Sequence, residues 1–215
     1  GSAYKTYDGT ALTYDEVSET GDGFVDGEGA VYEVTGTLTD VGKADNEFTY
    51  TLKEGTKAQN YTIILKFGEL EVTPVTERVV VTIKGKTGTY TYDGDTHTVS
   101  GYDVVSIDND LYTEEDFEFD GTASVSGTDA DEYQMGLTAA DFENISDNFT
   151  NVTFVVEDGH LEIEKRKVTF QAKSASKVYD GSALTEPEYE LVAGAGTLAD
   201  GQAEVVTVKG SQTLV

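Results

Sequence analysis

The feature that most constrains the fold is a tyrosine–aspartate–glycine triplet that occurs three times along the chain. The copies lie 85 and 87 residues apart, at Tyr7, Asp8 and Gly9, at Tyr92, Asp93 and Gly94, and at Tyr179, Asp180 and Gly181. Self-similarity at a fixed spacing is the sequence signature of a protein built from structural repeats. We therefore expect copies of one unit rather than a single large domain.

Longer segments recur together with the triplets. Residues 31–36 align with residues 116–121 and 205–210, and apolar residues alternate in these segments as they do on one face of a strand. The offset of 85 also pairs Phe48 with Tyr133, and further along an offset of 91 pairs Gly68 with Gly159. An insertion must therefore lie between these two pairs.

These alignments predict three repeats. A partial first repeat, residues 3–77, lacks its opening strand; the second, residues 78–165, is complete; the third, residues 166–215, lacks its closing strands. The insertion at residues 138–144 has a capping residue followed three positions later by an acid, which predicts one short helix. The apolar residues change parity at Gly68 and at Gly159, which requires a turn or bulge, and Glu157–His160 reads as a hairpin turn.

The composition predicts an all-β fold. The chain has 13 Tyr, nine Phe and 23 Gly but only two Pro, which favours strands joined by glycine turns. About six strands in fewer than ninety residues indicate tandem small β-sandwich modules of an Ig-like kind. A β-grasp sheet that covers the inserted helix is the alternative.

Charge and composition exclude several classes of partner. The net charge of −27 repels phosphate polymers and anionic lipid heads, so we expect no nucleic acid and no membrane insertion. No apolar stretch is long enough to span a membrane, and the chain has no cysteine. Gly1 and Ser2 resemble a cloning scar, which suggests a piece from the interior of a longer protein.

Catalytic chemistry has little support in the sequence. The histidines, His97 and His160, both lie beside turn residues, and neither a cysteine nor a Gly-x-Ser-x-Gly motif is present. We therefore predict that the chain is not an enzyme and has no cofactor. In the triplets Asp can bond nearby backbone and Gly can take positive φ, so we interpret them as structural turns whose Tyr covers a core edge.

A calcium site is the one metal hypothesis that the sequence offers. The acidic segment contains Asp108, Asp110, Glu114 and Asp116, but it lacks the glycine of an EF-hand loop and has Tyr112 where an oxygen ligand belongs. A looser calcium site and a solvated run of charge both remain open.

The triplet after a strand and the closing segment, Asn60-Tyr-Thr to Val72, resemble the MBG/YDG-type repeats of bacterial cell-surface proteins. Residues 174–185, which contain the third triplet, look like the opening of such repeats in large secreted proteins of gut Firmicutes. The second copy departs from the pattern at Asp95 and His97. The resemblance implies an extracellular location on the bacterial surface.

Two functions follow from the resemblance. As a stalk or spacer, each repeat contacts its neighbouring repeats and projects another domain. As an adhesin, the chain binds a host glycan, mucin or host protein through exposed aromatic residues, for which Tyr102, Tyr112 and Tyr133 are candidates. Incomplete repeats also predict end-to-end self-association by strand addition.

Overall fold

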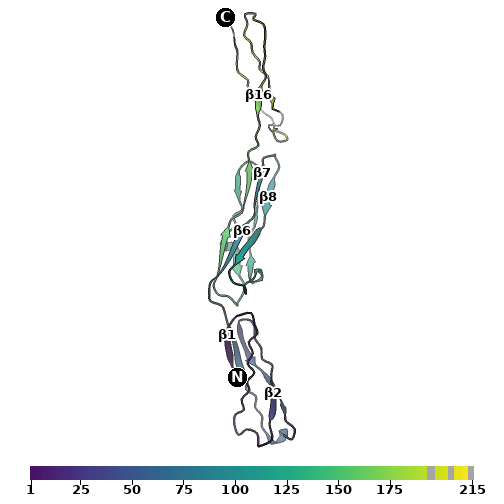
Figure 1. The fold of residues 1–215 in the computed structure, drawn as a ribbon, viewed down its shortest axis with the longest axis vertical. Coiled ribbons are helices and arrows are strands. Elements are labelled where there is room, and N and C mark those ends of the chain that lie inside the picture. Colours follow the sequence, from purple (N-terminus) through teal and green to yellow (C-terminus); the bar gives the residue numbers. More distant parts are fainter. Residues whose placement is uncertain (193–196, 203–205, 213–215) are drawn as a thin grey trace. The chain divides into compact units, whose positions relative to one another are not determined.

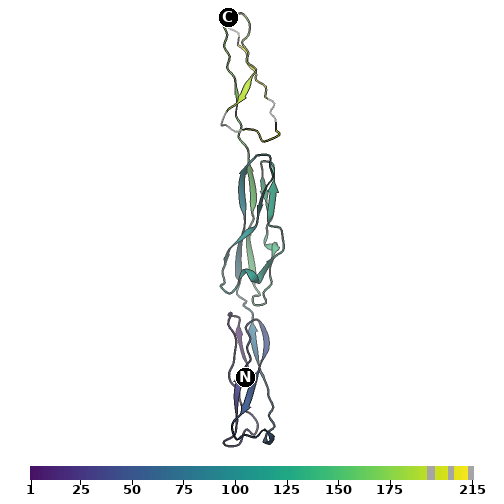
Figure 2. The ribbon, with the colours of Figure 1, turned by 90° about the vertical axis from the view of Figure 1, so that its right-hand side faces the viewer.

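The structure is a computed structural model that describes residues 1–192, 197–202 and 206–212. It contains two compact units: residues 1–82, 104–120 and 139–155 form the first, and residues 83–103, 121–138 and the described part of 156–215 form the second. Both units consist of strands and connecting loops (Figures 1 and 2). Because the middle repeat contributes to both units, the repeat boundaries stay a prediction.

The all-β prediction is confirmed. The helical elements among the described residues are 3-10 turns of three residues each, η1 (Ala58–Asn60), η2 (Glu114–Asp116) and η3 (Ala139–Asp141). No helix in that part of the chain is long and apolar enough to cross a membrane.

Of the short helix predicted at residues 138–144, the structure has the 3-10 turn η3 at Ala139–Asp141, and the rest of the segment is a strand. The turn η3 gives way at once to strand β13 (Phe142–Asn144), which pairs with β10 (Phe117–Phe119) and sets Phe142 opposite Phe119. Phe142 is buried against Phe117, and this tertiary packing outweighs the local capping signal. The β-grasp alternative, which needs a helix in the insertion, is therefore not supported.

The first repeat contains a three-stranded sheet and a strand pair. In the sheet, β5 (Gly68–Thr73) lies between β1 (Ala3–Thr6), which is parallel to it, and β3 (Gly42–Asn46), which is antiparallel. Strands β2 (Ala30–Val34) and β4 (Phe48–Leu52) form the antiparallel pair. Leu70 and Val72 are buried and alternate along β5 with exposed Glu69 and with half-buried Glu71 and Thr73, so they form the buried face of the sheet.

The middle repeat has the same strand pairings. Strand β15 (His160–Glu164) lies between β7 (Thr87–Thr91), parallel to it, and β12 (Glu132–Gln134), antiparallel to it. The pair β10 and β13 corresponds to β2 and β4. Two further sheets join β8 (His97–Ser100) to β11 (Ser124–Gly127), and β14 (Val152–Glu157), β6 (Val79–Gly85) and β9 (Tyr102–Ile107) in that order.

The strand register corrects the sequence alignment between residues 42 and 52. Tyr133 pairs with Leu161 as Ala44 pairs with Leu70, so Tyr133 is the counterpart of Ala44 and not of Phe48. Phe48 pairs with Val34 as Phe142 pairs with Phe119, so Phe48 corresponds to Phe142. The extra residues of the middle repeat thus lie in more than one loop.

The predicted hairpin at Glu157–His160 was wrong, whereas the change of parity at the glycine is real. Strands β14 and β15 do not pair with each other; they belong to different sheets, and so do β6 and β7. Gly85 and Gly159 meet where the chain passes between the sheets: a Cβ on Gly85 would collide with the Gly159 backbone, and one on Gly159 would collide with the Lys86 carbonyl. Glycine is required there because the backbones approach too closely for a side chain.

Only part of the third repeat can be compared. Strands β16 (Phe170–Ala172) and β17 (Tyr189–Leu191) form an antiparallel pair. Leu184 and Gln212 form an isolated bridge, as Leu12 and Leu38 do in the first repeat. Of the predicted strand at residues 205–210, Val205 lies outside the described residues, and residues 206–210 are not in a strand.

Candidate functional site

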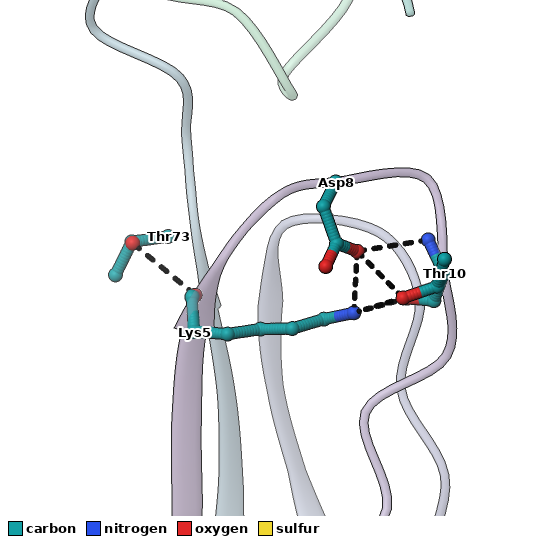
Figure 3. A network of polar contacts seen from close by, with 4 residues as sticks. All are labelled: Lys5, Asp8, Thr10 and Thr73. Atoms are coloured by element: carbon teal, nitrogen blue, oxygen red, sulfur yellow. Dashed lines mark hydrogen bonds and ion pairs between the residues drawn. The ribbon is translucent and has the colours of Figure 1, made fainter.

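The first Tyr-Asp-Gly turn is a closed network of polar contacts (Figure 3). The Asp8 Oδ1 atom accepts hydrogen bonds from the Thr10 backbone N–H at 2.9 Å and from the Thr10 hydroxyl at 2.7 Å. The Lys5 ammonium group lies 2.6 Å from the same oxygen and also donates to the Thr10 carbonyl. The network fixes the end of β1 to the turn that follows it.

The third turn repeats this arrangement. The Asp180 Oδ1 atom accepts from the Ser182 backbone N–H at 2.9 Å and from the Ser182 hydroxyl at 2.8 Å. Lys177 lies 2.8 Å from Asp180, at the same spacing along the chain as Lys5 from Asp8. The glycines of all three turns have positive φ, 75° at Gly9, 94° at Gly94 and 80° at Gly181.

In the second turn the aspartate still accepts a backbone hydrogen bond, but no lysine stands at the position of Lys5. Asp95 N–H donates to Asp93 Oδ1 at 2.9 Å, but Tyr90 stands at the position of Lys5. The cation's place is taken by His97, whose Nε2 lies 3.0 and 3.1 Å from the two Asp93 oxygens. The imidazole stacks on the Tyr90 ring, with centroids 4.2 Å apart.

These contacts stabilise the charged form of each aspartate. Hydrogen bonds from Lys5 and Thr10 lower the pKa of Asp8 to about 2, and those from Lys177 and Ser182 lower the pKa of Asp180 to about 2. The pKa of Asp93 is also lowered, first by the Asp95 backbone N–H and then by His97. The turns are therefore satisfied internally and offer no carboxylate poised for acid–base catalysis.

The tyrosine of the first triplet contacts the middle repeat within the first compact unit. Tyr7 is half-buried and packs edge-on against Phe149, which is 2 % exposed. Burial, Asp40 and Asp116 raise the pKa of Tyr7. The ring therefore covers the edge of a core that the next repeat supplies.

Asn148 adds polar contacts at the same place. Its Oδ1 atom accepts from the Val41 backbone N–H at 2.8 Å, and its Nδ2 group donates to Asp40 at 3.2 Å. The backbone of Val75 bonds to the residues on either side of Phe149, donating to the Asn148 carbonyl and accepting from Thr150. We call Tyr7, Asp40, Val75, Asn148 and Phe149 the junction.

The tyrosine of the second triplet makes similar contacts within the second compact unit. Gln202 Nε2 donates to the Tyr92 hydroxyl, and Arg166 donates to the Tyr92 carbonyl and to the Thr197 hydroxyl. A cavity of about 280 Å³ lies beside them, lined mainly by apolar atoms and including Ala199. Tyr7 and Tyr92 thus both bind residues that follow their own repeat.

The three tyrosines predicted as binding residues have different environments and do not form one surface. Tyr112 is 2 % exposed and donates to Asn144, so the prediction of an exposed ring was wrong; its place against Phe149 and Phe117 explains its burial. Tyr102 begins β9 and is half-buried. Tyr133 is half-buried against the core of Val99, Met135, Leu161 and Ile163, and it donates to the Asp129 carbonyl.

The structure does not gather the predicted calcium ligands. Asp108 accepts from the Val80 N–H, and Asp116 accepts from Thr113 in the capping box of η2. Asp110 and Glu114 are exposed. Within the described ranges no three acidic or histidine side chains converge on a metal position, so a calcium site here is not supported.

Sequence reasoning missed the junction residues Asn148 and Phe149 and the lysines of the turns. Lys5 and Lys177 could have been found, because each stands three residues before the aspartate of its triplet. No pattern in the sequence marks Phe149, because its contact partner Tyr7 lies far away along the chain.

The architecture is that of repeated all-β modules. Residues 79–165 match the family model of the MBG domain, and this segment is therefore an MBG domain, as the resemblance implied. MBG domains are repeat-type domains of cell-surface proteins and are not a known enzyme family. Comparison with curated proteins and with solved structures gave no match.

Proposed function

We propose that the chain is a spacer in the stalk of a bacterial surface protein, with neighbouring repeats of the same protein as its principal partners. The MBG domain at residues 79–165 supports a place outside the cell. The junction carries the proposal, because a spacer must transmit position from one repeat to the next, and the junction joins them by specific contacts.

The junction combines an aromatic contact with directional hydrogen bonds. Phe149 is fully desolvated between Tyr7 and Tyr112, with ring centroids 5.7 and 5.0 Å away. Buried aromatic pairs contribute about 0.5–1.5 kcal/mol beyond the area they bury. The Asn148 side chain fixes the loop at Asp40 and Val41, and each such hydrogen bond contributes about 1 kcal/mol.

The acidity of the chain supports the same role. With 41 acidic and 14 basic residues, the surface repels other acidic polymers and other copies of itself. A spacer benefits from this property, because it keeps crowded stalks apart and soluble.

Residual dipolar couplings of the whole chain test the junction directly. We expect residues 1–73 and residues 104–120 and 139–155 to share one alignment tensor. Asn148→Ala should give the two groups different tensors, whereas Asp147→Ala, at an exposed neighbour with no polar contact among the described residues, should leave one tensor. Two tensors in the unsubstituted chain would overturn the spacer proposal.

The adhesin hypothesis predicts a different result in a second experiment. The chain is applied to arrays of mucins, glycans and host matrix proteins at high concentration. The spacer proposal predicts no saturable binding. Saturable binding that Tyr102→Ala or Tyr133→Ala abolishes would favour the adhesin instead.

A further inference from the structure

The opening and closing segments of the middle repeat run side by side in the same direction. In the second compact unit β7 pairs with β15 in parallel over five residue pairs, from Thr87 with His160 to Thr91 with Glu164. The Tyr92 N–H then donates to the Glu164 carbonyl at 2.9 Å. The pairing therefore reaches the last residue of β15.

The residues that precede these strands follow the same order in the first compact unit. Val75 and Phe149 form a parallel bridge. Further along the chain Val79, the first residue of β6, donates its N–H at 2.9 Å to the carbonyl of Asn151, which directly precedes β14. The two segments thus advance together, and β6 and β14 begin side by side.

The two segments also change sheet at the same level. Lys84, near the end of β6, lies 2.7 Å from Glu157 at the end of β14. Directly after them, a Cβ on Gly159 would collide with the Lys86 carbonyl. This close backbone contact holds the two segments in a fixed register.

The first repeat has the same parallel pair. Strand β1 pairs with β5 from Ala3 with Leu70 to Thr6 with Thr73, and the Tyr7 N–H donates to the Thr73 carbonyl at 2.8 Å. In both repeats, therefore, the tyrosine of the triplet makes the last backbone bond of the pair, and the turn that follows leads the chain away.

Tension along the chain loads such a pair in shear. The pull enters the opening segment at its first residue and the closing segment at its last residue, and these lie at opposite ends of a parallel pair. The hydrogen bonds of the pair then share the load and must break together, whereas bonds that are loaded from one end break one after another. Because the survival of a loaded domain depends on its unfolding rate, breaking together makes the repeat last longer under force.

We propose that β6 with β14 and β7 with β15 form a clamp that lets the middle repeat bear tension along the chain. This load-bearing function rests on the spacer function, because a repeat is pulled at both ends only when it links other parts of a surface protein. It adds to that function a resistance to force that depends on direction.

Single-molecule force spectroscopy of the whole chain tests the clamp through the direction of pulling. The sequence has no cysteine, so two introduced cysteines define where the load is applied. Glu77→Cys with Lys167→Cys places the handles before β6 and after β15 and loads the clamp in shear. Asp95→Cys with Lys167→Cys is the matched control, because both handles then lie beyond the same end of the β7–β15 pair and peel it apart.

The two variants should differ under force and not at rest. All three substituted positions are exposed, so both variants should keep the midpoint of chemical unfolding of the unsubstituted chain. At the same constant force we expect the shear variant to unfold at least about tenfold more slowly than the peeling variant, because several bonds break together. Equal rates, or faster unfolding in shear, would overturn the clamp.

The result is distinguishable from failure of the spacer proposal, because the load does not pass through residues 1–76. Slow unfolding in shear together with two alignment tensors in the unsubstituted chain would support the clamp and overturn the spacer. One tensor together with equal unfolding rates would support the spacer and overturn the clamp.

Discussion

Tyr7 and Phe149 meet edge to face, with ring centroids 5.7 Å apart and ring planes at 78°. One ring belongs to the first Tyr-Asp-Gly triplet and the other to the loop before β14. This contact makes the triplet more than a local turn, because the turn aims its tyrosine at the core of the following repeat. The second triplet directs Tyr92 toward Arg166 and Gln202 in the same sense.

Replacing Phe149 should therefore loosen the whole junction. Phe149→Ala removes a 2 % exposed ring that contacts Tyr7 and Tyr112, and we expect a loss of about 3–5 kcal/mol in the free energy of unfolding. Chemical denaturation measures it. Val105→Ala, at a 59 % exposed position, is the control and should change stability by less than about 0.5 kcal/mol. Equal effects of the two substitutions would contradict the packing that we assign to Phe149.

The close approach of the backbone at Gly159 to that of Gly85 and Lys86 gives a second prediction. Gly159→Ala places a Cβ against the backbone of Gly85 and Lys86, which cannot yield as a flexible side chain can. We expect a loss of about 1–3 kcal/mol in thermal or chemical unfolding. Gly210→Ala, where the added Cβ meets nothing within 4 Å, should have little effect. A neutral Gly159→Ala would mean that the two strands do not cross so closely.

The local chemistry of the fold could be predicted from the sequence, and its long-range pairings could not. The Asp8 carboxylate accepts a hydrogen bond from Thr10, two positions along the chain, and Gly9 supplies the positive φ. Such a turn can therefore be recognised from adjacent residues alone. The parity change at Gly159 is also local, but nothing near it says that β14 and β15 belong to different sheets. The predicted hairpin failed for that reason.

The junction lies beyond sequence reasoning for a related cause. Phe149 and Asn148 are ordinary residues of a loop, and only the folded chain brings them to Tyr7 and Asp40. Tyr112 lies within the acidic segment and was predicted to be exposed, whereas its ring packs on Phe149. Charged neighbours along the chain do not determine where a side chain points.

The lysine of the first turn should control the titration of Asp8. The pKa of Asp8 is depressed to about 2, so the contacts of its carboxylate stabilise the fold above about pH 4 and are lost as the pH falls through about 2. Lys5→Met removes the largest cause and should raise the pKa of Asp8 toward its ordinary value, with Thr10 retaining part of the shift. Carboxyl carbon NMR measures the titration. Lys43→Met, which affects Glu69 and Glu71 instead, should leave Asp8 unchanged.

The second turn offers an exchange experiment, because it holds the same carboxylate with different residues. Asp93 is bound by His97, which stacks on Tyr90, whereas the other turns have a lysine at the position of Tyr90 and a leucine, Leu12 or Leu184, at that of His97. His97→Leu alone should raise the pKa of Asp93 while the Asp95 N–H keeps it below its ordinary value. Adding Tyr90→Lys supplies the missing cation and should lower the pKa of Asp93 again. Carboxyl carbon NMR of the single and double variants decides the point: if the lysine does not lower the pKa, the three turns do not share one geometry.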